Sequence, residues 1–322
     1  MATQNAAKDL PGVAITADVA SLTEAVQQAL EAIQAAMFEV VDSEITVLRD
    51  ASRHILEAGG KRIRPRLALL SFAAAGGVDM TPVIPVAAAI ELMHTASVVH
   101  DDINDHGVVR RGRPSVNAIW GRTFALLTGD YLFAKVYELM APYKDLNMML
   151  AEASVALVEG ETLQAAAVKE NRLSREVYYD IISRKTAALF RAPARLGAEL
   201  AGGTRAHVNA LAEFGYRIGL AFQIVDDILD LTGTTETIGK SAGLDLAQGK
   251  GFAAVTSPDE VTSDDPMETI KERVLKGTAV EEARVMARSL VASAIAELDV
   301  LPDSPAKDAL IELANQVIDR EF

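Results

Sequence analysis

Two aspartate clusters, each at the end of an apolar run, constrain this chain more than any other feature. They read Asp101-Asp102-Ile103-Asn104-Asp105 and Asp226-Asp227-Ile228-Leu229-Asp230, and they follow the runs Thr95 to Val99 and Leu220 to Val225. On a helix, the first and third acids of a cluster share one face, where like charges repel and destabilise the helix. Each cluster therefore predicts a helix that is buried at one end and carries carboxylates at the other.

The six carboxylates predict a metal site. One Asp-Asp-x-x-Asp pattern by itself is better read as a solvated acidic turn, but two of them in matching apolar surroundings favour a function. Oxygen-only ligands suit Mg²⁺ rather than zinc. We therefore expect Mg²⁺ to be held by Asp101, Asp102, Asp105, Asp226, Asp227 and Asp230.

Helical periodicity runs through most of the chain. Apolar residues recur at spacings of three and four from Leu22 to about Ala58, which predicts two amphipathic helices. Further helices are expected to open at residues 61–66, to end in the first acid cluster, and to cover about 118–140, 146–168, 174–200 and 206–231, with two or three short ones at the end. No run alternates as a strand would. We predict an all-α fold.

The two clusters also bear on domain organisation. Asp101 and Asp226 lie 125 residues apart, which is too far for a solenoid repeat but fits two helices that face each other across one bundle. The 322 residues would also allow two smaller domains. We predict a flexible tail over residues 1–20 and one all-helical catalytic domain over 21–322, because the start has no clear period.

Composition disfavours several classes of protein. The chain has no cysteine, which excludes a disulfide framework, a thiolate zinc site and a cysteine nucleophile. Its net charge of −14 disfavours nucleic acid as a partner, although bound metal and local basic residues leave a small phosphorylated ligand open. The start lacks a signal or transit pattern, and the apolar segment from Val83 to Val99 is interrupted by Pro85, Glu91 and His94. We expect a cytoplasmic protein without a transmembrane segment.

Basic residues near the acids indicate what the metal would hold. Lys61 and Arg64 lie one turn apart, and Arg110-Arg111 follow the first cluster after a short loop. Lysine and arginine donate charge-assisted hydrogen bonds to phosphate oxygens. Acids with Mg²⁺ and a separate basic group suit two diphosphates, one bound through metal and the other through cations. Taken singly, each basic cluster fits a solvated surface as well as it fits a diphosphate-binding site.

Two polar residues lie toward the acidic ends of the predicted helices. His94 comes two turns before Asp101, and Gln223 comes three residues before Asp226. A histidine in such a place is more commonly a satisfied core residue, but it could also donate to a diphosphate. Gln223 could face a reacting centre.

These features belong to a series of segments that occur in order along the chain. The segments are Gly59-Gly60-Lys61-Arg62-Ile63-Arg64-Pro65, Glu91-Leu92-Met93-His94-Thr95, the first acid cluster with Arg110-Arg111-Gly112, Gly129-Asp130-Tyr131, Glu159-Gly160-Glu161, Arg184-Lys185-Thr186-Ala187, Phe222-Gln223 before the second cluster, Gly239-Lys240, and Asp245-Leu246 through Gly249-Lys250. Together they make the chain resemble the trans-isoprenyl diphosphate synthases, the polyprenyl synthetase family. The resemblance runs from about Gly59 to Lys250, and a weaker similarity continues to the end of the chain.

The resemblance implies a helical bundle around a central active-site cavity, usually a homodimer, and a role for each matching residue. The six aspartates would hold a cluster of about three Mg²⁺ ions on the allylic diphosphate. Arg110, Lys185, Lys240 and Lys250 would also contact that diphosphate, Gly60, Lys61, Arg64, His94 and Arg111 would hold isopentenyl diphosphate, and Lys185, Thr186 and Gln223 would form the catalytic centre, with Thr186 and Gln223 facing the carbocation.

The implied activity is Mg²⁺-dependent head-to-tail condensation of isopentenyl diphosphate with an allylic diphosphate. In the family, bulky groups one turn before the first cluster close the pocket floor, whereas Ala96 and Ser97 are small here. We therefore predict geranylgeranyl or longer all-trans polyprenyl diphosphate as the product, with Leu132 or Phe133 as alternative floor residues.

One segment departs from the family pattern, and two other functions stay open. After Lys250 the family commonly has a residue and then Thr-Leu-Pro, where this chain has Gly251-Phe252-Ala253-Ala254. That difference puts the packing of the C-terminal helices in doubt more than the chemistry. The alternatives are a terpene cyclase of similar fold, which would leave Lys61, Arg64 and Arg111 without a substrate, and a non-catalytic regulatory subunit, against which the intact acids argue.

Overall fold

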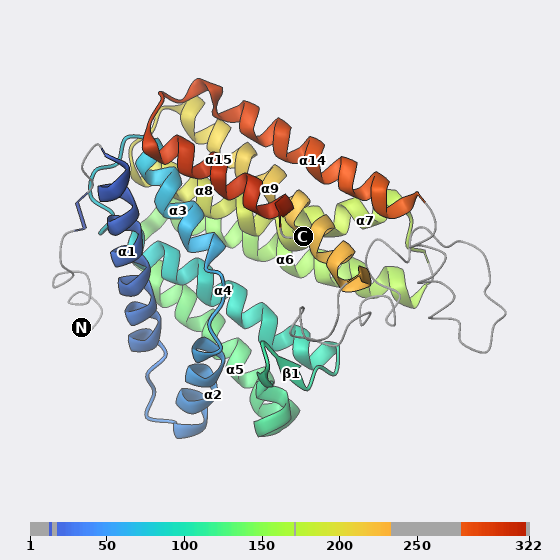
Figure 1. The fold of residues 1–322 in the computed structure, drawn as a ribbon. Coiled ribbons are helices and arrows are strands. Elements are labelled where there is room, and N and C mark those ends of the chain that lie inside the picture. Colours follow the sequence, from blue (N-terminus) through green and yellow to red (C-terminus); the bar gives the residue numbers. More distant parts are fainter. Residues whose placement is uncertain (1–12, 15–17, 171, 233–277, 320–322) are drawn as a thin grey trace.

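The computed structural model describes residues 13–14, 18–170, 172–232 and 278–319, and within them the chain is almost wholly helical (Figure 1). The α-helices are α1 (Val19–Val40), α2 (Thr46–Glu57), α3 (Ile63–Ala74), α4 (Val83–Asn104), α5 (Val116–Met140), α6 (Lys144–Lys169), α7 (Arg175–Ile182), α8 (Ala188–Leu200), α9 (Arg205–Thr232), α14 (Ala279–Glu297) and α15 (Pro305–Ile318). Two short 3₁₀ turns, η1 (Ala141–Tyr143) and η3 (Leu298–Val300), follow α5 and α14. The prediction of an all-α fold is confirmed.

Local sequence explains where several helices begin. The side chains of Asp18, Ser115, Ser174 and Ser304 each accept a hydrogen bond from a backbone N–H three residues later. These bonds satisfy donors that the first turn of a helix leaves open. Pro305 follows its capping serine at the first position of α15, where a missing N–H costs nothing.

Two local features differ from what the periodicity predicts. The helix expected over 174–200 is divided into α7 and α8 by a π-helical turn, η2 (Ser183–Ala187). The basic loop contains a minimal antiparallel hairpin, β1 (Val109–Arg110) and β2 (Arg113–Pro114). Its two central residues, Arg111 and Gly112, both have positive φ, as a tight primed turn requires. Two-residue strands are too short to produce an alternating pattern, so the sequence does not predict them.

Helix α4 lies in the middle of the core. Its residues from Val86 to Leu92 are almost completely inaccessible, and it packs against α1, α3, α5 and α8. In the described part of the chain it is also the one helix long and apolar enough to cross a membrane, but 72% of its most apolar window is buried inside the protein. Its apolarity is therefore accounted for by its place in the core.

Two described residues before α1, Val13 and Ala14, contact the body of the protein. Val13 is buried, its carbonyl accepts a hydrogen bond from the N–H of Met80 at 3.0 Å, and Ala14 pairs with Asp79. Two residues of the predicted tail are thus held against the loop before α4, and α1 begins at Val19. The division into a tail and one catalytic domain stays a prediction.

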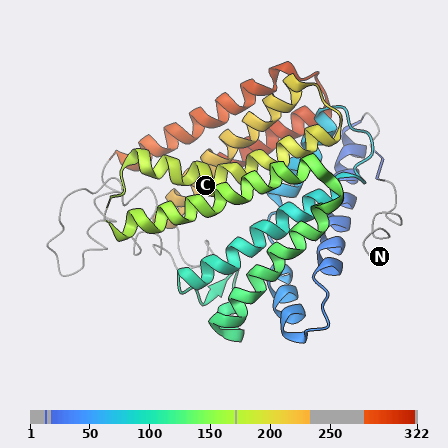
Figure 2. The same ribbon diagram turned by 180° about the vertical axis from the view of Figure 1, so that it is seen from behind.

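The arrangement of α4 and α9 positions the two acid clusters. Both helices run in the same direction through the bundle, so their C-terminal ends open on the same side of the molecule (Figure 1). Helix α8 packs against both, and α9 also packs against α14. Seen from behind, α6 lies in front of α4 and α8 (Figure 2), and it packs against α8. The expectation that the two acid-bearing helices share one bundle is confirmed.

Candidate active site

The second acid of the first cluster is a buried carboxylate paired with a cation. Asp102 lies in the last turn of α4 with 2% of its side chain exposed, and its Oδ1 accepts hydrogen bonds from Arg110 Nε at 2.9 Å and Nη2 at 2.5 Å. Burial raises the pKa of Asp102, although the guanidinium of Arg110 opposes that rise. The hairpin β1–β2 turns Arg110 back onto the helix end, so the pair depends on that turn.

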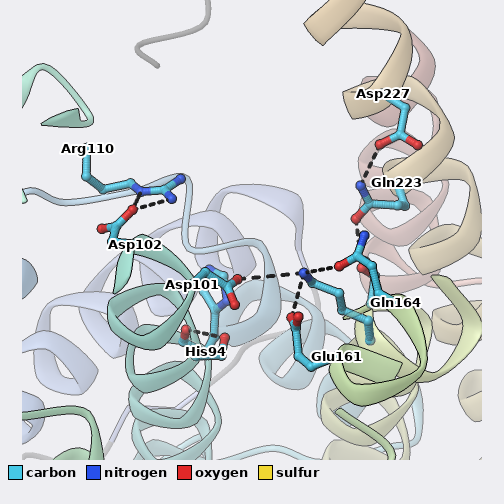
Figure 3. Close-up of polar contacts among 11 residues, drawn as sticks. His94, Asp101, Asp102, Arg110, Glu161, Gln164, Gln223 and Asp227 are labelled. Carbon is cyan, nitrogen blue, oxygen red and sulfur yellow. Dashed lines mark hydrogen bonds and ion pairs between the residues drawn. The ribbon is translucent and has the colours of Figure 1, made fainter. Parts of the chain in front are cut away.

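The first acid of the same cluster faces a lysine from the π-helical turn. Lys185 Nζ lies 3.9 Å from Asp101 Oδ2, 2.5 Å from Glu161 Oε1 and 3.1 Å from Gln164 Oε1 (Figure 3). Burial raises the pKa of Asp101 to about 7; Lys185 lowers it, and the nearby carboxylates of Glu161 and Asp105 raise it further. Burial opposes the charge of Lys185, but Asp101 and Glu161 outweigh burial and raise its pKa above the usual value. Lys185 therefore stays an ammonium group.

Two glycines allow the π-helical turn to lie where it does. A Cβ on Gly160 of α6 would be 2.7 Å from the backbone N of Lys185, and a Cβ on Gly219 of α9 would be 2.6 Å from the Cα of Ala187. Any side chain at either position would push the turn away. Short π-helical segments are rare and occur often at functional sites, and here the segment carries Lys185 and Thr186.

The second acid of the second cluster is held by neutral donors. Asp227 accepts a hydrogen bond from Tyr178 Oη at Oδ2 and one from Gln223 Nε2 at Oδ1, both at 2.8 Å. Thr186 Oγ1 donates to Gln223 Oε1 at 2.7 Å. Figure 3 shows Asp227 and Gln223 facing the side of the site that carries Asp101 and Glu161. Asp230 is buried one turn further along α9.

A small cavity lies between the two clusters. Its lining includes Asp105, which directly follows α4, and residues from α6, α7, η2 and α9: Gln164, Tyr178, Lys185, Thr186, Gln223 and Asp227. All three predicted catalytic residues, Lys185, Thr186 and Gln223, thus line one cavity with an acid from each cluster.

A separate cationic group lies deeper in the protein around one buried acid. Glu91 of α4 is 4% exposed and accepts a hydrogen bond from Arg62 Nη1 at 2.8 Å. Burial lowers the pKa of Arg64 to about 10, a shift that Glu91 and Asp226 oppose. Burial, together with Arg64, Arg111, Arg110 and Arg62, lowers the pKa of His94 well below its usual value, so His94 is neutral.

Glycine at position 60 lets the loop before α3 meet the basic hairpin. A Cβ on Gly60 would lie 2.8 Å from Arg111 Nη1, and Gly60 has a φ of 151°, which side chains rarely adopt. Four residues predicted to hold one diphosphate, Gly60, Arg64, His94 and Arg111, are therefore close together.

The geometry matches what comparison with known proteins finds. Residues 45–287 match the family model described as polyprenyl synthetase. The chain is 39% identical to the short chain isoprenyl diphosphate synthase of Methanothermobacter thermautotrophicus, over 86% of this chain and 91% of that protein. It is 37% identical to heptaprenyl diphosphate synthase component 2 of Geobacillus stearothermophilus, over 91% and 96% of the two chains.

The chain belongs to the polyprenyl synthetase family.

A solved structure agrees with this assignment. The polyprenyl synthase from Caulobacter crescentus, whose crystal structure is complexed with calcium and isoprenyl diphosphate, superposes with a TM-score of 0.87 at 32% identity and covers 95% of this chain and 99% of that one. The predicted resemblance is confirmed, and with it the all-α isoprenoid synthase fold and the enzyme class. The protein is a prenyltransferase.

The residues suit the divalent metal that this family uses. In the described part of the chain, no three acidic or histidine side chains converge closely enough to enclose an ion by themselves. Mg²⁺ usually keeps several waters and is held by one or two carboxylates plus substrate phosphates, so separated clusters fit an ion whose site a diphosphate completes. Asp102 Oδ2, which is buried and has no hydrogen-bond partner among the described residues, is an oxygen suited to such an ion.

Some predicted site residues lie elsewhere or outside the described residues. Lys61 is exposed and lines a surface hollow with Arg66 and the end of α15. Ala96 and Ser97 are buried, and the hydroxyl of Ser97 donates to the carbonyl of His94 at 2.8 Å. Lys240, Lys250 and the atypical segment Gly251–Ala254 lie outside the described residues.

Sequence reasoning assigned no role to several side chains that the structure places in the site. Glu161 and Glu91 belong to segments that carry the resemblance, but no spacing rule connected them to Lys185 or to Arg62. Tyr178 and Gln164 carried no signal, because each lies on a helix face that only tertiary packing turns toward the cavity.

Proposed function

We propose that this prenyltransferase is an all-trans polyprenyl diphosphate synthase, which condenses isopentenyl diphosphate head-to-tail with an allylic diphosphate to give geranylgeranyl or a longer polyprenyl diphosphate. The observation that carries the proposal is one cavity lined by Lys185, Thr186, Gln223 and acids of both clusters, beside a separate cationic group around Glu91. Two anion-binding sites of different chemistry, one acidic with metal and one cationic, suit two diphosphate substrates.

The allylic diphosphate would bind at the acid clusters. Asp101, Asp102, Asp105 and Asp226, with Asp227 and Asp230, would hold Mg²⁺, which supplies Lewis-acid stabilisation of charge on the departing diphosphate. Lys185 would donate to oxygens of the same diphosphate, since its ammonium group lies 3.9 Å from Asp101 Oδ2 and both side chains are partly buried. Arg110 would add a second cation, and Lys240 and Lys250 are proposed to do so as well.

Isopentenyl diphosphate would bind at the basic group. Arg64 and Arg111 would donate to its phosphate oxygens, and His94, whose pKa is lowered by burial and by the neighbouring arginines, would add one N–H donor. Gly60 would let the phosphate approach the backbone. Lys61, which lines a surface hollow beside α15, is proposed to join them.

The reaction then needs no nucleophilic side chain. The bond between C1 of the allylic group and its diphosphate oxygen breaks, and the electron pair leaves with the diphosphate. The double bond of isopentenyl diphosphate attacks the allylic cation, a new carbon–carbon bond forms, and a proton is lost to the released diphosphate. Thr186 and Gln223 would face the cation, and the apolar core around α4 and α9 would keep water from quenching it.

Product length is the finer part of the proposal. The relatives named above are described as a short chain synthase and as a component of a heptaprenyl synthase, so family membership alone leaves the length open. Small residues at positions 96 and 97 support a product longer than farnesyl diphosphate. Phe133, which stacks on His100 with ring centroids 6.0 Å apart, is a candidate for the floor beyond them.

The protein is also proposed to act as a cytoplasmic homodimer. Helices α5 and α6 lie on one face of the molecule (Figure 2) and carry exposed apolar side chains: Ile119, Phe124, Leu127 and Tyr137 on α5, and Met148, Val155 and Val158 on α6. Exposed apolar patches of this kind mark interaction surfaces. One relative is named as a component, which makes a heteromer the alternative. Light scattering of the purified chain separates these outcomes, and Phe124→Glu should dissociate a homodimer built on this face.

One incubation tests the function. Purified protein with Mg²⁺ and isopentenyl diphosphate is offered dimethylallyl, geranyl, farnesyl or geranylgeranyl diphosphate in separate reactions, and products are read by mass spectrometry. Elongation of at least one primer is expected, and the longest product gives the chain length. If a well-folded sample elongates none of them, the proposed function of the isolated chain is wrong, and a regulatory subunit or a cyclase becomes the better reading.

A further inference from the structure

A buried chain of hydrogen bonds connects α7, α9 and the π-helical turn beside the cavity. Tyr178 Oη donates to Asp227 Oδ2, Gln223 Nε2 donates to Asp227 Oδ1, and Thr186 Oγ1 donates to Gln223 Oε1. Tyr178, Asp227 and Thr186 are each less than 7% exposed, so water competes poorly for these bonds. All four residues line the same cavity.

The hydrogen bonds give the orientation of the Gln223 amide. Its NH₂ group faces Asp227, to which Nε2 donates, and its carbonyl oxygen faces Thr186, from which Oε1 accepts. The amide oxygen of Gln223 can only accept a hydrogen bond, so the Thr186 hydroxyl donates its single proton to it. The proton of the Thr186 hydroxyl therefore points to Gln223 and not to the cavity. Both residues present partially negative oxygens beside the cavity.

Tyr178 is the last residue of this chain of hydrogen bonds, at the end opposite Thr186. Its hydroxyl occupies Oδ2 of Asp227, which leaves Oδ1 to receive the Gln223 amide. Loss of that bond would remove one restraint on the carboxylate, and the amide could then turn its NH₂ group, a positive dipole end, toward the cavity. Dipoles that are fixed before the reaction stabilise a developing charge better than groups that must reorient.

We propose that Tyr178 is a positioning residue for the ionisation step: through Asp227 it holds the carbonyl oxygen of Gln223 and the hydroxyl oxygen of Thr186 toward the allylic cation. The inference rests on the proposed function and extends it to a residue on α7. Tyr178 acts through its neighbours and supplies neither a proton nor a ligand to the substrate.

A matched pair of tyrosine variants tests the proposal. Tyr178→Phe removes the hydroxyl and keeps the ring, and Tyr179→Phe makes the same change on the adjacent residue, whose ring packs edge-on against that of Tyr178 at 5.6 Å. In the described part of the chain, the hydroxyl of Tyr179 makes no hydrogen bond. Steady-state kinetics with both substrates and thermal unfolding are measured for the wild type and both variants.

The expected result is a change in turnover without a change in binding. Tyr178→Phe should lower kcat by roughly 10-fold, about 1.4 kcal/mol in the barrier, and leave both KM values within about twofold. Tyr179→Phe should match the wild type. Scrambling of an oxygen label between the bridging and non-bridging positions of the allylic diphosphate reports ionisation alone, and it should slow in parallel with kcat in Tyr178→Phe.

Other outcomes would overturn the proposal. Equal kcat in the two tyrosine variants, or a raised KM with unchanged scrambling, would show that Tyr178 has only a packing role. If Tyr178→Phe does not fold, Thr186→Val tests the opposite end of the chain: retained wild-type scrambling would show that the oriented oxygen is not needed. Failure of the wild type to elongate any primer would refute the proposed function itself, a result distinct from these.

Discussion

The second acids of the two clusters occupy the same place in the same motif, yet their surroundings differ. Asp102 is paired with a cation, Arg110, which a hairpin after α4 returns to the helix end. Asp227 accepts hydrogen bonds from two neutral groups, Tyr178 and Gln223. The motif brings a carboxylate to the end of a buried helix in both cases. The elements that pack beside that end decide whether the carboxylate is charge-paired or used to orient an amide.

The first acids of the two clusters, Asp101 and Asp226, also have different surroundings. Asp101 faces Lys185 and Glu161, and burial makes its ionised form costly when no metal is bound. Asp226 lies close enough to Arg64 to oppose the fall in the pKa of that arginine, so it connects the acid side of the site with the basic group. Each cluster therefore contacts a different part of the site, and substitutions in the two should have different consequences.

The largest effect is expected from removing the first acid of either cluster. Asp101→Ala or Asp226→Ala should lower kcat/KM by on the order of 10³-fold or more, because charge on the leaving diphosphate would lose several kcal/mol of stabilisation. Asp308→Ala, on the exposed surface of α15, is the control and should leave kcat/KM unchanged. Turnover retained by either cluster variant would remove that cluster from the proposed metal site.

Neighbouring arginines should separate the two substrates. Arg110 pairs with Asp102 of the acid cluster, and Arg111 lies by Gly60 and within the field of Glu91. Arg110→Ala should raise KM for the allylic diphosphate roughly 10-fold, and Arg111→Ala should do so for isopentenyl diphosphate, as loss of a charge-assisted hydrogen bond predicts. If both variants affect the same substrate, the assignment of two separate diphosphate sites is wrong.

The unusual pKa of Asp101 predicts a pH-dependent stability. Its pKa is about 7 in the folded protein against an ordinary 3.8, so the folded state binds a proton that the unfolded state has released between these values. Stability should therefore fall as pH rises from about 4 to about 7 when metal is removed. Asp101→Asn lacks this loss, and its advantage over the wild type should be about 3 kcal/mol larger at pH 8 than at pH 5.

Urea unfolding in the presence of a chelator measures this difference. An advantage that is the same at both pH values would mean that Asp101 ionises normally in the folded protein. Adding Mg²⁺ with a non-reactive diphosphate should reduce the advantage, because these ligands stabilise the wild type through the ionised carboxylate.

The smallest effect on rate is expected from substitutions at Ala96 and Ser97, about one turn before the first cluster. Substitution at Ala96 should instead change the chain length of the product. Ala96→Tyr should shorten the product while kcat changes by about threefold or less for short primers, because the ring would fill the space into which the chain grows. Ser97→Ala, with a similar volume, should leave the product unchanged. Mass spectrometry of the products decides the matter, and an unchanged product in Ala96→Tyr would place the floor elsewhere, with Phe133 the next residue to substitute.

The sequence by itself determined the helical fold, the paired acid clusters and the family. Helices repeat every 3.6 residues, and carboxylates four residues apart share a face, so both features are local and can be read along the chain. The segments from Gly59 to Lys250 occur in a fixed order that a comparison of sequences can recognise. These properties survive without any knowledge of which helices touch.

Only the tertiary structure decided how the acids are held. Glu161 meets Lys185 because a π-helical turn and Gly160 bring α6 and η2 together, and Tyr178 meets Asp227 because α7 packs on α9. These pairs are separated by 24 and 49 residues, and no periodic pattern relates side chains on different helices. Local spacing fixes the face on which a side chain lies, whereas its partner depends on the packing of the whole bundle, and that packing makes two similar motifs chemically different.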